Sequence, residues 1–348
     1  MMEESRHLMN ISLHAFAQKL FQPFLDQEGV TEMAINRPGE IWSEQHGVWH
    51  KHDHSNITNK LLHSFAIALA SFNETAIDDL SPVLSGTLET GERIQVVMYP
   101  ATEKDVISVT LRKPSKSNFN HAAYIEQGFY QKVITPTIIN EDQQDLIHLY
   151  TQKEMAAFME KAVEMGKTMV FAGATGSGKT SYMKTLVENI PLSCRLITLE
   201  DTSEMRFYKH QNYVHLFFTE EGGGAQEAMI TSAQLLKACF RMKPDRILLS
   251  EIRGGESWDF IKAIHSGHGG SMTSIHAGSA QEALEGMITR CFQNPECQNL
   301  KYDLIKNMVY SSVDVVCHLV SKAGKRTLNE IYFKDVDYKK LKPDDDVF

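Results

Sequence analysis

One eight-residue stretch, GATGSGKT from Gly173 to Thr180, constrains the fold of this chain more than any other. It fits GxxxxGK[ST], in which glycines permit tight, partly left-handed turns, so that several backbone N–H groups face one anion. Such a loop joins a strand to a helix, and the apolar TMVFA before it and the helix-compatible residues after it suit both. The stretch predicts a nucleotide site, with Lys179 on the β- and γ-phosphates and Thr180 on Mg²⁺. The predicted nucleotide-binding residues are Gly173, Ala174, Thr175, Gly176, Ser177, Gly178, Lys179, Thr180 and Ser181.

From Ile147 onward, short apolar segments alternate with amphipathic ones. The strand-like segments read TMVFAG, RLITLED, YVHLFF, RILLSE and GSMTSIHA, with helix-like segments between them. This alternation predicts an α/β domain over residues 147–348, with a largely parallel sheet and helices on both faces. Residues 326–348 read as a closing strand pair followed by a charged tail.

The first third of the chain has a different pattern. Residues 13–30 and 57–72 read as helices, and alternating strand-like pieces lie between them and after them. This predicts a smaller α+β domain over residues 1–114. From 115 to 146 the pattern weakens and polar residues dominate, which predicts a linker with short helices.

Composition excludes several classes of protein. The formal net charge of −9 argues against an electrostatic nucleic-acid binder, so we expect no stable direct nucleic-acid binding. Five cysteines without a CxxC pair, and no HExxH pattern, argue against a disulfide framework or a structural zinc site. No apolar run reaches the roughly 18 residues of a membrane span, and the N-terminus does not resemble a signal peptide. These features predict a cytoplasmic protein whose membrane contact is peripheral.

Acidic residues follow two of the predicted strands. RLITLED ends at Glu200 and Asp201, and RILLSE ends at Glu251, at the sheet edge where the phosphate loop also lies. Phosphoryl transfer needs Mg²⁺ ligands and a group that orients the attacking water. We interpret Glu200 as the water-orienting base and Glu251, with Thr180, as a metal-site residue, two roles that could be exchanged. Asp201 and Glu204 fit a helix-capping segment as well as direct chemistry.

Four motifs stand in order along the second half: GATGSGKT, LITLEDTSEM, RILLSEIRGGE and GHGGSMTSIHAGS. Their order and wording resemble the Walker A, acidic box, atypical Walker B and histidine box of the secretion ATPases. Within that group the chain most resembles the traffic ATPase of bacterial type IV secretion systems. Pilus-retraction and type II secretion ATPases are more distant relatives. INRPGEIW, GERIQVVMYP and ISVTLRKPS also resemble pieces of the N-terminal domain of that family.

The resemblance implies a homohexameric ring in which N-terminal domains stack on RecA-like P-loop NTPase domains. ATP would lie at the junction of the two domains and of adjacent subunits. It further implies an ATP-hydrolysing motor that energises secretion at the cytoplasmic face of the inner membrane, with other subunits of the secretion machine as partners. Lys179 and Thr180 match the Walker A roles, Glu200 the acidic-box role and Glu251 the Walker B role.

The histidine box spans Gly267 to Ser279. Its two histidines have no acid or cysteine between them, which argues against a metal site. His276 would follow a strand beside the phosphate-loop strand, and we interpret it as a γ-phosphate sensor. His268 fits the C-terminal end of a helix. The resemblance also implies that N-terminal arginines reach the phosphates, and Arg93 and Arg112 lie in the matching segments, although both also fit surface charges.

Three more arginines lie beside the motifs. Arg253 is a candidate partner of Glu251 or Glu256, and Arg241 and Arg246 are candidate contacts between subunits. Three alternative functions stay open. The first is a pilus-retraction or type II secretion ATPase, the second a RecA-like nucleic-acid motor with a basic channel, and the third a nucleotide-switched scaffold without enzymatic activity.

Overall fold

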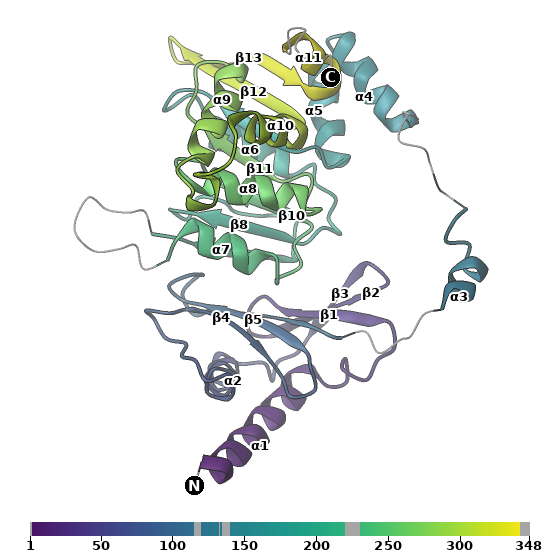
Figure 1. Cartoon of the computed structure of the whole chain (residues 1–348), viewed down its shortest axis with the longest axis vertical. Helices are drawn as coiled ribbons and strands as arrows, with labels where there is room; N and C mark the ends of the chain where they lie inside the picture. Colours follow the sequence, from purple (N-terminus) through teal and green to yellow (C-terminus); the bar gives the residue numbers. More distant parts are fainter. Residues whose placement is uncertain (1, 115–119, 132, 134–139, 220–229, 342–348) are drawn as a thin grey trace.

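The computed structural model describes residues 2–114, 120–131, 133, 140–219 and 230–341. Figure 1 shows two β-sheets, each with its own helices, and helix α3 (His121–Glu126) apart from both. The first sheet belongs to a smaller α+β unit and the second to an α/β unit with a largely parallel sheet. The predicted fold class is confirmed.

The first sheet has the strand order β3-β2-β1-β6-β5-β4, and each neighbouring pair is antiparallel. Its strands are β1 (Val30–Ile35), β2 (Glu40–Gln45), β3 (Val48–Asp53), β4 (Val83–Thr87), β5 (Arg93–Met98) and β6 (Ile107–Arg112). Helices α1 (Met2–Phe21) and α2 (Asn59–Phe72) form one core with this sheet. The alternate strand positions face away from this core, and there Gln95 and Thr110 are buried although they are polar, as is Asn36 just after β1.

Helix α1 differs from the predicted helix over residues 13–30, because it ends at Phe21. Pro23 has no backbone N–H to continue the hydrogen-bond ladder. Residues 22–29 form turns instead, and Gly29 has a φ of +80°. The prediction for residues 22–30 was therefore wrong.

The second sheet has the order β13-β12-β7-β11-β10-β8-β9, and all of its neighbouring pairs are parallel except β12–β13. Its strands are β7 (Met169–Ala172), β8 (Leu196–Glu200), β9 (Tyr213–Phe217), β10 (Arg246–Leu249), β11 (Met272–Ile275), β12 (Val315–Lys322) and β13 (Lys325–Phe333). The predicted parallel-rich sheet is confirmed.

Two separate cores cover the two faces of this sheet. Val170 and Ala172 of β7 pack into one core, whereas Met169 and Phe171 pack into the other, as the period of a strand requires. The first core includes α7 (Ser232–Cys239), α8 (Glu256–His265), α9 (Ala280–Cys291) and α10 (Tyr302–Ser312), and a 3₁₀ turn, Pro295–Cys297, follows α9. The second core includes α4 (Glu141–Thr151), α5 (Met155–Glu164) and α6 (Lys179–Val187).

Two segments bear on the predicted boundaries. Helix α4 runs across residue 146, where the linker was predicted to end, and the division at 114 and 146 stays a prediction. The predicted closing strand pair after residue 325 was wrong, because β13 pairs with the preceding β12 and is followed by helix α11 (Lys334–Leu341). Asp335 and Asp337 lie in the first turn of α11, where acidic side chains favour a helix start. The predicted charged tail falls largely on residues 342–348, outside the described residues.

Polar contacts join the two sheets at the β8–β9 edge. Arg195, which is completely buried, donates from Nη1 to the Oδ1 atoms of Asn36 and Asn212, 2.6 Å away in each case. Thr102 Oγ1 donates to the carbonyl oxygen of His215 at 2.8 Å. This edge lies far from β12 and β13, so the N-terminal domain docks at one end of the second sheet. Among the described helices, none is long and apolar enough to cross a membrane.

Candidate nucleotide-binding site

The loop between β7 and α6 has the geometry that its glycines predict. Gly178 caps α6 with a φ of +94°, a left-handed conformation that side chains disfavour. Gly173 has no room for a side chain, since an added Cβ would lie 2.5 Å from the carbonyl oxygen of Leu319. The Ser177 hydroxyl is buried and has no hydrogen-bond partner among the described residues. The loop thus opens the N-terminus of α6 toward a ligand, as a phosphate cradle requires.

Lys179 and the histidine box meet at this loop. Lys179 Nζ donates to the carbonyl oxygens of Gly173 at 2.9 Å and Ala174 at 3.3 Å, and lies 3.3 Å from His276 Nδ1. An ammonium only donates, so His276 Nδ1 accepts and the ring proton is on Nε2. That Nε2 atom lies 2.8 Å from Oε1 of Glu251. Three of the four motifs therefore form one contact chain, Lys179–His276–Glu251.

Burial shifts both ends of this chain toward their neutral forms. It lowers the pKa of Lys179, although the nearby Glu251 opposes the shift. It raises the pKa of Glu251, although His276 and Lys179 oppose the shift. A buried carboxylate with a raised pKa is a better proton acceptor than an exposed one.

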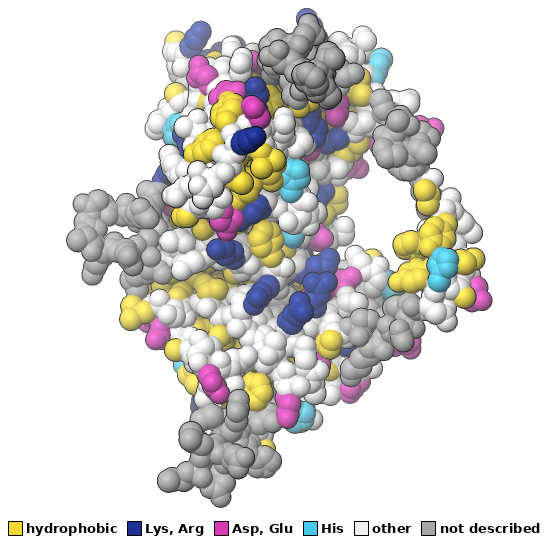
Figure 2. Space-filling model, viewed as in Figure 1, with side chains coloured by type: hydrophobic (Ala, Val, Ile, Leu, Met, Phe, Trp, Pro, Cys, Tyr) yellow, Lys and Arg dark blue, Asp and Glu magenta, His cyan; other side chains and the backbone are white. Residues whose placement is uncertain are grey.

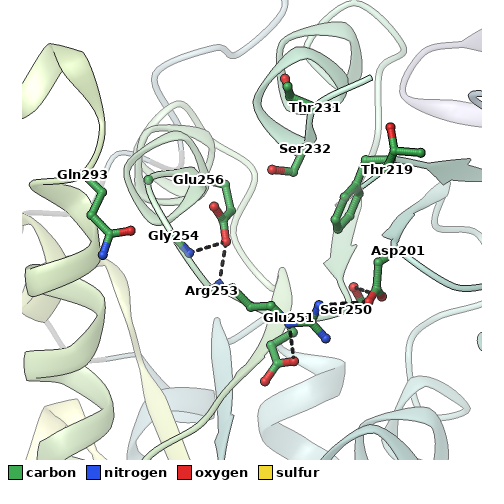
Figure 3. Close-up of a pocket in the computed structure, with 12 residues that line it drawn as sticks. Asp201, Thr219, Thr231, Ser232, Ser250, Glu251, Arg253, Gly254, Glu256 and Gln293 are labelled. Atoms are coloured by element: carbon green, nitrogen blue, oxygen red, sulfur yellow. Dashed lines mark hydrogen bonds and ion pairs between the residues drawn. The ribbon is translucent and has the colours of Figure 1, made fainter. Parts of the chain in front are cut away.

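A second set of contacts extends from Glu251 into a neighbouring cavity of about 520 Å³. Arg253 Nε donates to Glu251 Oε2 at 2.8 Å, and Arg253 Nη1 lies 3.1 Å from Asp201 Oδ2. Figure 3 shows these three side chains side by side at the cavity wall, with Glu256 accepting hydrogen bonds from the backbone N–H groups of Arg253 and Gly254. Of the two candidate partners of the Arg253 side chain, the structure pairs it with Glu251.

Glu200 is placed differently from Glu251. Its side chain is completely buried, and Oε2 accepts hydrogen bonds from the backbone N–H groups of Glu204 at 2.7 Å and Met205 at 2.8 Å. Oε1 accepts from Thr198 Oγ1 at 2.6 Å and lies 3.2 Å from His215 Nδ1. Burial alone would raise the pKa of Glu200, but these hydrogen bonds outweigh it and hold the pKa below its ordinary value. Oε2 thus holds the segment after β8 in place, while Oε1 is held by side chains of β8 and β9.

The predicted N-terminal arginines do not reach the phosphate loop of their own chain. Figure 2 shows Lys and Arg side chains gathered near the junction of the two domains. Arg93 and Arg112 line a cavity of about 330 Å³ there, together with Arg241 and Lys243. Arg112 Nε lies 3.1 Å from Glu32 Oε1, and burial raises the pKa of Glu32 to about 7 even beside this arginine. The contact of Arg93 and Arg112 with phosphates stays a prediction.

The remaining predicted residues are those of the phosphate loop and Arg246. Thr175, Gly176, Thr180 and Ser181 lie in the phosphate loop or at the start of α6, as predicted from the motif. Arg246 donates to the carbonyl oxygen of Gly269 at 2.9 Å, inside its own chain.

Sequence reasoning missed His215 and Thr198, which hold Glu200. The only signal in the sequence was that Thr198 and Glu200 share one face of β8.

Comparison with known proteins gives consistent matches over this architecture. The family model described as Type II/IV secretion system protein matches residues 133–343. The type IV secretion system protein VirB11 of Brucella suis biovar 1 (strain 1330) is 41% identical over 321 residues, which cover 90% of this chain and 88% of that protein. The type IV secretion system protein PtlH of Bordetella pertussis (strain Tohama I) is 34% identical over 323 residues, which cover 92% and 95%.

A solved structure agrees over nearly the whole chain. The crystal structure of the VirB11 ATPase from the Brucella suis type IV secretion system, in complex with sulphate, has a TM-score of 0.89 at 39% identity and covers 95% of this chain and 97% of that one. With a family model over more than half of its length and relatives at 41% and 34% identity, this chain belongs to the Type II/IV secretion system protein family and is a relative of its VirB11 ATPases.

Proposed function

We propose that this protein is an ATP-hydrolysing, hexameric motor that energises type IV secretion from the cytoplasmic face of the inner membrane. The contact chain Lys179–His276–Glu251 carries the proposal, because it joins a phosphate-binding lysine to a partly buried carboxylate through a polar side chain. Membership of the family and similarity to a VirB11 ATPase support the secretion role. Other subunits of the secretion machine are the expected partners.

ATP binding would use groups that are already positioned. The backbone N–H groups of the loop and of the α6 N-terminus face the phosphates. Lys179 would exchange its contacts with the carbonyl oxygens of Gly173 and Ala174 for the β- and γ-phosphates. Thr180, at the start of α6, fits Mg²⁺, since its hydroxyl supplies an oxygen ligand of the kind that this ion prefers, and Glu251, after β10, would meet the ion through a bound water. When bound, Mg²⁺ neutralises phosphate charge.

We assign the role of general base to Glu251 instead of Glu200, the residue to which the sequence first assigned it. In this step the oxygen of water attacks the γ-phosphorus, its proton passes to Glu251, and ADP leaves. The raised pKa of Glu251 and its place beside His276 and Lys179 support the assignment. Arg253 holds the second oxygen of the same carboxylate. Glu200 instead positions the backbone after β8, where Asp201 meets Arg253.

His276 would report whether a γ-phosphate is present, because Lys179 cannot keep its present contact with Nδ1 of His276 when the same ammonium binds the phosphate. His276→Ala should lower turnover about 10-fold to 100-fold while ADP affinity stays unchanged. Phosphate release and ADP titration measure the two effects. His268→Ala is the matched control, since His268 contacts Phe240 and the carbonyl oxygen of Ala263 instead. Loss of ADP binding in His276→Ala would contradict the sensor role.

The function itself is tested by phosphate release from purified protein with ATP and Mg²⁺, followed as protein concentration changes. Arg93 and Arg112 lie away from their own phosphate loop, so we propose that a neighbouring subunit supplies them. Turnover per chain should then fall on dilution, as mass photometry shows hexamers dissociating. Lys179→Ala should remove nucleotide binding. A fully active monomer would refute the hexameric site, and turnover in Lys179→Ala equal to the parent would refute the site assignment.

The nucleic-acid motor is separated from this proposal by single-strand binding at low and high salt. We expect weak binding and no stimulation of turnover, because the net charge is −9. Tight, salt-sensitive binding with stimulated turnover would overturn the export function.

A further inference from the structure

A β-hairpin lies against the phosphate loop and belongs to none of the four motifs. Strand β12 runs parallel to β7, with His318 opposite Ala172 at the end of β7. Because β12 continues to Lys322, the tip of the β12–β13 hairpin extends past β7, beside the loop that follows it. The close approach of the Leu319 carbonyl oxygen to Gly173 shows that the two backbones touch.

Arg326 on β13 reaches the phosphate loop from this hairpin. A Cβ built on Gly178 would lie 2.9 Å from Arg326 Cδ, 3.3 Å from Nε and 3.5 Å from Nη1, so the guanidinium lies directly over the glycine that starts α6. The side chain is exposed, and within the described ranges no carboxylate forms an ion pair with it. A free cation therefore lies beside backbone N–H groups that are arranged for phosphate.

The order of the strands fixes which end of the nucleotide Arg326 would meet. His276 follows β11 and Glu251 follows β10, both on one side of β7. Strands β12 and β13 lie on the opposite side. The γ-phosphate must point toward His276 and Glu251 for hydrolysis. The nucleoside end must then point toward β12 and β13.

We propose that Arg326 is a nucleotide-binding residue that holds the α-phosphate, the phosphate next to the nucleoside. This rests on the proposed ATP site and adds a contact from outside its motifs. ADP and ATP both carry the α-phosphate, so Arg326 contributes equally to the affinity for each. It takes no part in the transfer of the γ-phosphate, which occurs on the other side of β7.

Titration of the full-length protein with ADP and with a non-hydrolysable ATP analogue tests the proposal. Arg326→Ala should raise the Kd for both ligands about 10-fold, the loss expected for a charge-assisted hydrogen bond. Arg326→Lys should recover most of the affinity because it keeps the charge. Lys325→Ala removes the same charge from the adjacent exposed position and should leave both Kd values unchanged. Thermal midpoints should stay equal across these variants.

Each other result counts against the proposal. An unchanged ADP affinity in Arg326→Ala would overturn it, as would a loss confined to the ATP analogue. A lysine variant as weak as the alanine variant would overturn the phosphate contact. If the parent protein bound neither ligand, the proposed ATP site itself would fail, which is a separate outcome from normal parent binding with no effect of Arg326→Ala.

Discussion

Replacing Glu251 by Gln is expected to lower ATP turnover about 10³-fold, because an amide cannot accept the proton of the attacking water. Glutamine has the same size, so the neighbouring contacts of Lys179 with Gly173 and Ala174 should persist. We therefore expect ADP affinity near that of the parent protein. Phosphate release at saturating ATP measures the first effect, and ADP titration the second.

Glu200→Gln is the matched control, since it makes the same chemical change at the end of the adjacent strand β8. Glu200 accepts four hydrogen bonds, two of them from the backbone N–H groups of Glu204 and Met205. The NH₂ group of glutamine would face N–H or O–H groups that now donate to Glu200, and these donors would lose their acceptor. We therefore expect a loss of about 1–3 kcal/mol in unfolding free energy. Turnover of the folded protein should fall less than 10-fold. Near-normal turnover in Glu251→Gln, with turnover abolished in Glu200→Gln at an unchanged thermal midpoint, would return the base to Glu200.

The order of the motifs and the alternation of strands and helices were sufficient to predict the second sheet and the meeting of three motifs. Lys179, Glu251 and His276 each follow or adjoin a short apolar strand, and parallel strands end at one edge. Their proximity therefore follows from local sequence. Glu200 also lies at that edge, but a strand turns successive side chains to opposite faces, and Glu200 lies on the same face of β8 as Thr198. The motif alone does not determine on which face of β8 the Glu200 side chain lies.

Other features depend on contacts between distant segments. Arg326 lies about 150 positions after Gly178 and contacts it only because β12 pairs with β7. Arg195 precedes an apolar strand, where an arginine is usually exposed. It is buried because the N-terminal sheet covers it. No spacing rule links it to Asn36, which lies 159 positions earlier.

Replacing Arg195 by Met is expected to lower the free energy of unfolding by about 3 kcal/mol or more, because it leaves buried polar partners unsatisfied. Asn36 Oδ1 and the carbonyl oxygen of Met242 would lose their donor, and Asn212 Oδ1 would lose one of its two donors and keep Asn36 Nδ2. Burial lowers the pKa of Arg195 only to about 10, so the side chain is charged at neutral pH and its hydrogen bonds are charge-assisted. The guanidinium also lies 5.3 Å from the ring of Trp49. Urea unfolding followed by tryptophan fluorescence thus reports on this interface.

Arg206→Met provides the control, because Arg206 is exposed and its loss should change stability by less than about 0.5 kcal/mol. The domain interface also contains apolar contacts, since Val97 and Ala101 of the N-terminal domain pack into a core of the second sheet. If those contacts alone hold the domains together, Arg195→Met will unfold at the same urea concentration as Arg206→Met. If Arg195 is the main link, its variant will unfold earlier and the N-terminal domain will become sensitive to protease first. Under the proposed function, docking at the β8–β9 edge holds Arg93 and Arg112 where a neighbouring subunit would use them, so weakening it should also reduce turnover.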